Sequence, residues 1–234
     1  MQVGAAVGFP AARRLQADRR LLAAIVVFVI GAALTLLLTP VVPELPSLIQ
    51  AAETLGVPRL NLHTAELVDG QAARPRQRAT GQMWLTAART LERLGELGAA
   101  AGVTFCVENL NTIVDHPGVP LARAKDVLAL VEGVAHPNVK MMLDLYHAQI
   151  GEGNLIELCR ACRPWIGEIQ VADVPGRAQP GTGEISYRAV ATALRSMGYR
   201  GTVNTLLNFG EGKYPVGGKA GAEFIENGHR FLQN

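Results

Sequence analysis

Cysteine is scarce in this sequence. Three residues, Cys106, Cys159 and Cys162, are an odd number in a chain of 234 residues, which argues against a disulfide framework and favours a reducing compartment. Cys159 and Cys162 form a C-x-x-C pair, but no second pair and no nearby histidine completes a zinc site. Helical spacing would put both thiols on one apolar face, so we expect a structural role for them.

Aromatic residues and net charge are also low. Aromatic residues make up 5% of the chain and the formal net charge is +2, so the sequence offers neither a base-stacking platform nor a field that attracts a polyanion. We therefore expect no nucleic-acid partner. The hydrophobic fraction of 49% argues against disorder and raises the question of where the apolar residues lie.

One long segment near the N-terminus lacks charge altogether. Residues 21–43 contain no charged side chain. At about 1.5 Å per helical residue, the apolar run 21–42 is long enough to span a hydrocarbon core of about 30 Å, which predicts a transmembrane helix. The positive-inside rule then places the N-terminus in the cytoplasm, because basic residues precede the run closely and the next one follows only at Arg59. The preceding basic residues are Arg13, Arg14, Arg19 and Arg20.

Two alternatives remain for this segment. It could instead form a buried helix or a pair of buried strands in a soluble α/β protein, or it could be an artefact of a mis-joined or frame-shifted 5′ region. We accordingly divide the chain into an N-terminal segment, 1–43, and a second region, 44–234.

The second region alternates short apolar runs with amphipathic stretches of helical length. This pattern is typical of β-α-β units around a parallel sheet. Residues 84–100 illustrate the helical stretches, with apolar side chains at spacings of three. The number and spacing of the strands predict an α/β fold of the (β/α)8 TIM-barrel type with about five βα units. The expected strands are residues 59–63, 103–108, 139–144, 168–172 and 201–206.

Polar residues stand at the ends of three consecutive predicted strands. In a barrel of parallel strands, the active site forms at the carboxyl ends of the strands, so these side chains are candidates for chemistry. Two carboxylates and an amide oxygen would form a hard site suited to Mg²⁺ or Mn²⁺. Such a cation would stabilise an enediolate, with a neighbouring glutamate as the base. The candidates are Glu108 and Asn109, Asp144 and His147, and Gln170 and Asp173.

At these positions the sequence resembles a known family. The segments 107–111 (VENLN), 142–147 (MLDLYH), 169–177 (IQVADVPGR) and 180–184 (PGTGE) strongly resemble the hydroxypyruvate isomerase family of xylose isomerase-like TIM barrels. The resemblance covers roughly residues 48–206. It implies the last five βα units of an eight-stranded barrel, so the barrel would be N-terminally truncated and preceded by a hydrophobic helix.

The resemblance also implies an activity and a set of site residues. The reaction would isomerise a small hydroxy-oxo acid, converting hydroxypyruvate to tartronate semialdehyde, or would be the related 2-oxo-tetronate isomerisation. Glu108 matches a catalytic glutamate that also binds the metal, Asp144 and Gln170 match two further metal ligands, and His147 and Arg177 match residues that hold the polar end of the substrate. The cofactor would be Mg²⁺ or Mn²⁺. Family resemblance implies a cytoplasmic location, segment 21–42 a membrane one, and homo-oligomerisation stays open.

The sequence departs from the family in two places. The last strand of the family ends in a second acid/base glutamate that also binds the metal, and here Leu206 takes its place. Glu211 could replace it only if its loop folds inward. In addition, residues 1–47 are too few and too apolar to supply three more βα units, so a partner chain completes the barrel, the domain rearranges, or the reading frame is damaged.

Three functional hypotheses follow from the sequence. The first is a metal-dependent isomerase of the hydroxypyruvate isomerase type. The second is a catalytically impaired homologue that binds only metal or a sugar acid, which Leu206 and the missing first strands favour. The third is a membrane-anchored interaction module, which only segment 21–42 favours.

Overall fold

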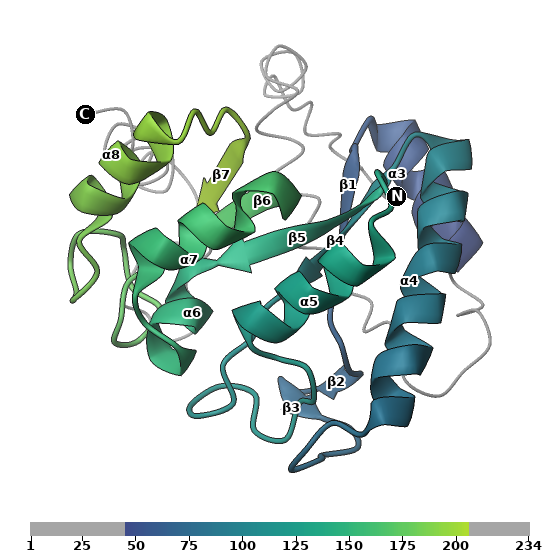
Figure 1. The fold of residues 1–234 in the computed structure, drawn as a ribbon, viewed down its shortest axis with the longest axis horizontal. Helices are drawn as coiled ribbons and strands as arrows, with labels where there is room; N and C mark the ends of the chain where they lie inside the picture. The colour runs from purple at the N-terminus through teal and green to yellow at the C-terminus, as the bar shows by residue number, and fades with distance from the viewer. Residues whose placement is uncertain (1–44, 206–234) are drawn as a thin grey trace, which may run out of the picture.

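The computed structural model describes residues 45–205, and in this part of the chain five parallel strands form one sheet (Figure 1). The order in the sheet is β1-β4-β5-β6-β7, so neighbouring strands follow one another along the chain. All five predicted strands are confirmed to within two residues. They are β1 (Arg59–Leu62), β4 (Thr104–Glu108), β5 (Val139–Asp144), β6 (Ile166–Val171) and β7 (Thr202–Thr205).

Helices connect the strands and cover one face of the sheet. In Figure 1, α4, α5 and α7 lie in front of the strands. The sheet is curled, and together with the helices on its outer side it forms half of a TIM-barrel-like fold, as the strand spacing predicted. The helices are α3 (Leu45–Leu55), α4 (Gly81–Ala101), α5 (Ala124–Val134), α6 (Leu145–Gly151), α7 (Leu155–Cys162) and α8 (Tyr187–Ser196).

The two faces of the sheet differ in polarity because successive side chains alternate sides. Side chains such as Phe105, Leu143 and Ile169 belong to the hydrophobic core that packs under the helices. The residues between them face the opposite, inner side, and many of these are polar although they are buried. They include Glu108, Asp144, Glu168 and Gln170.

Helix α4 shows how local sequence sets the element boundaries. Thr80 caps its first turn, because its hydroxyl accepts a hydrogen bond of 3.2 Å from the backbone N–H of Met83. The helix ends at Ala101 and is capped by Gly102, which has a left-handed φ of 68°. Gly98 lets α4 approach the start of β4 closely, since a Cβ there would clash with the carbonyl oxygen of Val103.

Cys159 and Cys162 lie on the buried side of α7 as free thiols, as their spacing predicted. Burial raises the pKa of each to about 12, with the charge of Cys159 contributing to the shift at Cys162. Both therefore behave as small apolar core residues.

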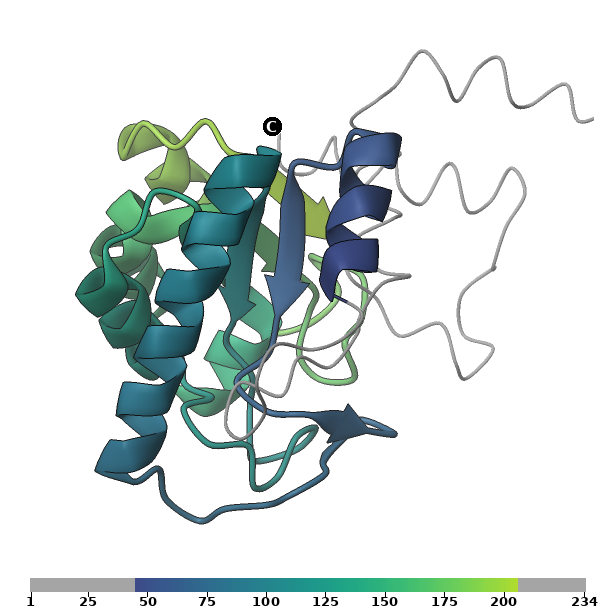
Figure 2. The same ribbon diagram turned by 90° about the vertical axis from the view of Figure 1, so that its right-hand side faces the viewer.

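A short hairpin escaped the sequence analysis. Strands β2 (Leu67–Val68) and β3 (Gln71–Ala72) pair antiparallel and lie beyond the carboxyl ends of the main strands (Figure 2). The hairpin is tied to the loop after β4, because Gln71 donates a hydrogen bond of 3.1 Å to the carbonyl of Asp115. This hairpin and the loop after β4 therefore pack together next to the end of the sheet that carries the candidate site.

Among residues 45–205, none of the helices is long and apolar enough to cross a bilayer. The predicted membrane span 21–42 lies outside the described residues, as do Leu206 and Glu211.

Glu168 gives a prediction about stability. Its side chain is 3% exposed, and burial raises its pKa to about 7, against the lowering effect of Arg59. The native state therefore holds a proton on Glu168 that the unfolded chain releases near pH 4.5, so this group lowers stability as pH rises from about 5 to 7. We expect Glu168→Gln to match the wild type at pH 5 and to be more stable at pH 8, by up to about 3 kcal/mol.

Denaturant unfolding of both proteins at pH 5 and pH 8 measures this difference. A stability difference that is the same at both pH values would contradict the prediction.

Candidate active site

Four of the predicted site residues meet at the carboxyl end of the sheet. Glu108 ends β4, Asp144 ends β5, and Gln170 lies opposite Asp144 on β6. His147 lies in the first turn of α6, directly after β5. Nε2 of His147 is 3.8 Å from Oε1 of Glu108 and 3.9 Å from Oδ2 of Asp144. All four side chains are buried, so three neighbouring βα units build one enclosed polar cluster.

The side-chain amide of Gln170 completes this cluster. One of its terminal atoms lies 3.1 Å from Oδ2 of Asp144 and 3.2 Å from Oε1 of Glu108. With nitrogen in that position, the amide donates to both carboxylates; with oxygen there, three oxygens from three strands face one point. The second orientation requires a cation between them, because three acceptors without a donor repel one another.

Glu108 is held ionised by its neighbours. Asn61 donates a hydrogen bond to its Oε2, and Nε2 of His63 lies 3.1 Å from the same oxygen. Burial acts to raise the pKa of Glu108, but the hydrogen bond and charge of His63, with the charges of His147 and Arg177, lower it to about 2. The carboxylate is therefore charged and fixed in orientation at neutral pH.

Asp144 has the opposite electrostatic balance. Burial raises its pKa to about 7, Arg177 acts against this, and the charge of Glu108 adds to it. Nη2 of Arg177 lies 3.2 Å from Oδ2 of Asp144. Oδ1 of Asp144 accepts a hydrogen bond from the backbone N–H of His147, and Asp144 thereby caps the first turn of α6. Two carboxylates thus share a buried space, and the site holds a proton or a cation more readily than a second full negative charge.

His147 is neutral and points an unpaired nitrogen into the cluster. Burial lowers its pKa to about 4. Asn111 uses its oxygen to accept from the backbone of Val114 and Asp115, so its amide nitrogen faces Nδ1 of His147 at 2.8 Å. Nδ1 then accepts and the proton lies on Nε2. Nε2 is buried and has no hydrogen-bond partner, so it is free to donate to an oxygen of a bound molecule.

The structure places Arg177 on the loop after β6, near the cluster. Besides its contact with Asp144, its guanidinium lies 5.2 Å from the ring of Tyr146. Asp173 shapes this loop: one carboxylate oxygen accepts from the backbone of Val174 and Ile185, and the other accepts from Gly181. Asp173 is therefore a structural anchor for the loop that carries Arg177.

Asn109, like Asp173, has a structural role. Its side chain accepts from the backbone N–H of Asp144 and donates to the carbonyl of the same residue. The two bonds lock the ends of β4 and β5 together, which fixes the spacing of Glu108 and Asp144.

Several residues around the cluster were not predicted from the sequence as site residues. Asn61 and His63 contact Glu108 from β1 and the residue after it, while Asn111 and His116 approach His147 from the loop after β4. His116 precedes a proline, which is typical of an exposed turn, but it is half-buried and its Nδ1 lies 2.6 Å from the carbonyl of Gly70. The only usable signal in the sequence was a position just after a strand, which Asn111 has.

The described residues offer one group that could hold a metal ion, formed by Glu108, Asp144 and His147, whose ligand atoms lie within 4.8 Å of one another. The two carboxylate oxygens suit a hard divalent cation, and the Gln170 amide can add a third oxygen. The donor on Nε2 favours a substrate contact over a metal bond for His147. The cluster therefore fits the predicted set of Glu108, Asp144 and Gln170, and which residues bind the metal stays a prediction.

Comparisons with known proteins agree with this architecture. The chain is 34% identical over 158 residues to 2-oxo-tetronate isomerase from Cupriavidus necator, covering 66% of this chain and 56% of that protein. It is 35% identical over 101 residues to hydroxypyruvate isomerase from Escherichia coli, covering 43% of this chain and 39% of that protein. The chain thus spans about half the length of the curated relatives it matches, or less.

A solved structure and a family profile extend the match. D-psicose 3-epimerase from Clostridium cellulolyticum H10 superposes with a TM-score of 0.62 at 22% identity, covering 84% of this chain and 70% of that one, which shows a shared fold. The profile of the xylose isomerase-like TIM barrel matches residues 42–226, most of the chain and the whole of the described sheet. The chain therefore belongs to the xylose isomerase-like TIM barrel family.

Proposed function

We propose that this chain isomerises a small hydroxy-oxo acid, converting hydroxypyruvate to tartronate semialdehyde with the help of Mg²⁺ or Mn²⁺. One observation carries the proposal: Glu108, Asp144 and Gln170 converge from three consecutive strands beside the unpaired Nε2 of His147. The names of the curated relatives support the same class of reaction.

The reaction moves protons within one molecule. One proton moves from C3 of hydroxypyruvate to C2, and the hydroxyl proton moves from the oxygen on C3 to the oxygen on C2, so no atom is gained or lost. A divalent cation held by Glu108, Asp144 and Gln170 would polarise the carbonyl and stabilise the enediolate.

Glu108 is the group that we assign to the carbon-bound proton. It is ionised at neutral pH and oriented by Asn61 and His63, so it is in the form that accepts a proton. Both carbons of an enediolate lie in one plane, so a carboxylate on one side of that plane can take the proton from C3 and return it to C2.

His147 and Arg177 are placed to hold the substrate. Nε2 of His147 carries a proton directed into the cluster and can donate it as a hydrogen bond to a substrate oxygen. The guanidinium of Arg177, which contacts Asp144, can pair with the substrate carboxylate. Together they would fix which carbon faces Glu108.

A second candidate function is binding without efficient catalysis. Leu206 stands where the family resemblance places a second acid/base glutamate, and a leucine neither transfers a proton nor binds a cation. The chain also spans about half the length of its curated relatives, so whole-protein activity remains a proposal.

An isomerase assay with hydroxypyruvate and Mn²⁺ separates the two functions. We expect the wild type to turn over, and Leu206→Glu to turn over at least about tenfold faster, because a second carboxylate supplies the missing acid/base group. A silent wild type beside an active Leu206→Glu variant would support the impaired homologue. If both are silent while Mn²⁺ is bound, the isomerase proposal is wrong for this chain.

A further inference from the structure

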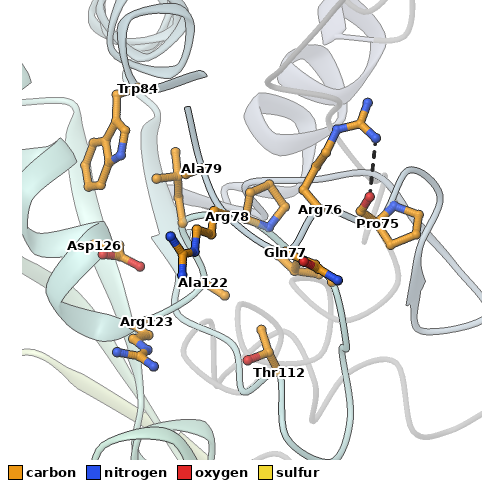
Figure 3. Close-up of a pocket in the computed structure, with 14 residues that line it drawn as sticks. Pro75, Arg76, Gln77, Arg78, Ala79, Trp84, Thr112, Ala122, Arg123 and Asp126 are labelled. Atoms are coloured by element: carbon orange, nitrogen blue, oxygen red, sulfur yellow. Dashed lines mark hydrogen bonds between the residues drawn. The ribbon is translucent and has the colours of Figure 1, made fainter. Parts of the chain in front are cut away.

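A cavity lies apart from the metal cluster, between two loops at the same end of the sheet (Figure 3). Its volume is about 710 Å³, within the range of small-molecule sites. One wall is the segment 75–79 that leads to α4, and the other is the segment 118–123 that leads to α5. Trp84, Thr112 and Asp126 complete the lining.

The walls of this cavity are held in place by the fold. The backbone N–H of Arg76 donates to the carbonyl of Gly118 across the gap, at 2.8 Å. Gly118 has a φ of 81°, and a Cβ there would lie 2.5 Å from Pro75, so the two loops meet in close contact. Beneath them, Val119 and Ala122 are buried in a small apolar cluster with Ala65 and Leu110. The cavity is thus built on a packed base.

Its lining carries an excess of positive charge. Three arginines, Arg76, Arg78 and Arg123, face a single carboxylate, Asp126. None of these three arginines forms an ion pair with another residue of the segment 45–205. Figure 3 shows Arg76 turned toward the carbonyl of Pro75, to which it donates at 3.3 Å. Arg78 and Arg123, on opposite walls, are therefore the cations available to an occupant.

We propose that this cavity binds a small phosphorylated metabolite. Guanidinium groups bind phosphate in a bidentate manner, and two of them on opposite walls can grip one phosphate from both sides. The ring of Trp84 offers an apolar surface for the carbon part of the ligand. The excess of positive charge, the aromatic wall and the cavity volume together support this choice of ligand.

The loop after β4 contributes to both the cavity and the metal cluster. None of the residues that line the cavity belongs to the metal cluster. Thr112 lines the cavity, while the preceding Asn111 points to His147. Ligand binding here can therefore be measured without metal and without turnover, so its failure is distinguishable from failure of the isomerase proposal.

Tryptophan fluorescence provides a direct test. The chain has two tryptophans, so Trp165→Phe leaves Trp84, in the cavity wall, as the sole reporter. We expect pyrophosphate, titrated at low salt without divalent cations, to change the emission of this variant in a saturable way. Adding Arg78→Ala or Arg123→Ala should weaken binding at least tenfold. Arg188→Ala, at an exposed arginine on α8, is the matched control and should leave the affinity unchanged.

Three results would overturn the proposal. The first is no saturable change in emission. The second is an affinity in the Arg78→Ala and Arg123→Ala variants equal to that of the Trp165→Phe parent. The third is tighter binding of citrate than of pyrophosphate, which would show that the cavity prefers carboxylates to phosphate. Circular dichroism of each variant checks that the fold is retained, so that lost binding is attributable to the missing guanidinium.

Discussion

Glu108→Gln is expected to reduce hydroxypyruvate turnover about a thousandfold, the range in which a positioned general base acts. The reason is that Glu108 is a charged carboxylate at neutral pH, with its pKa lowered to about 2, and glutamine cannot accept a proton. Glutamine keeps the shape of the side chain and an oxygen that can still accept from Asn61 or His63. Rates measured at saturating Mn²⁺ would separate loss of the base from weaker metal binding.

Glu168→Gln provides the matched control for this experiment. Glu168 is also a buried glutamate on the inner face of the sheet, on β6, but it lies outside the residues that could hold a metal. The Glu168→Gln variant should retain most of the wild-type activity. Equal losses in the two variants, or a Glu108→Gln protein with more than a tenth of wild-type turnover, would show that Glu108 is not the base.

The fold was predictable because its signals are local. The strands are short apolar runs, four of the five begin just after a turn signal, and parallel pairing of consecutive strands follows from the helices between them. Polar residues at the ends of apolar runs also identified Glu108, Asp144 and Gln170 as candidates. A few residues of sequence were enough for each of these inferences.

The contacts within the site were not predictable in the same way. His63 is 45 residues before Glu108, and Asn111 is 36 residues before His147, so only the register of the sheet and the path of a loop bring them together. The sequence also could not separate chemistry from scaffolding. Asn109 and Asp173 stand at strand ends like the metal candidates, yet their side chains hold backbone groups. The β2–β3 hairpin has two residues per strand, too few for a detectable period.

The resemblance to hydroxypyruvate isomerases added roles that geometry alone does not assign. The distances around His147 admit it as a metal ligand, whereas the resemblance makes it a substrate contact. The bond from Asn111 agrees with the second role, since it leaves the proton on Nε2. A structural detail outside the motif thus supports one of two chemically sensible assignments.

Asp144→Asn is expected to weaken Mn²⁺ binding at least about a hundredfold, because the cluster loses one of its two carboxylates. Asparagine can still cap α6 by accepting from the backbone of His147, so the variant should stay folded. Calorimetric titration of the metal-free protein with Mn²⁺ measures the affinity, and Glu157→Gln, at an exposed carboxylate on α7, is the control. Unchanged affinity in Asp144→Asn would exclude Asp144 as a ligand.

The pH dependence of metal binding tests the same site independently. Burial raises the pKa of Asp144 to about 7, so below that pH an incoming cation must displace a proton. Wild-type affinity for Mn²⁺ should therefore rise up to about tenfold per pH unit below pH 7 and level off above it. Asp144→Asn has no such proton to displace and should lose most of this dependence. A wild-type affinity that is flat between pH 5.5 and 7 would mean that the cation binds elsewhere, because a buried carboxylate paired with Glu108 cannot bind a cation and keep its proton.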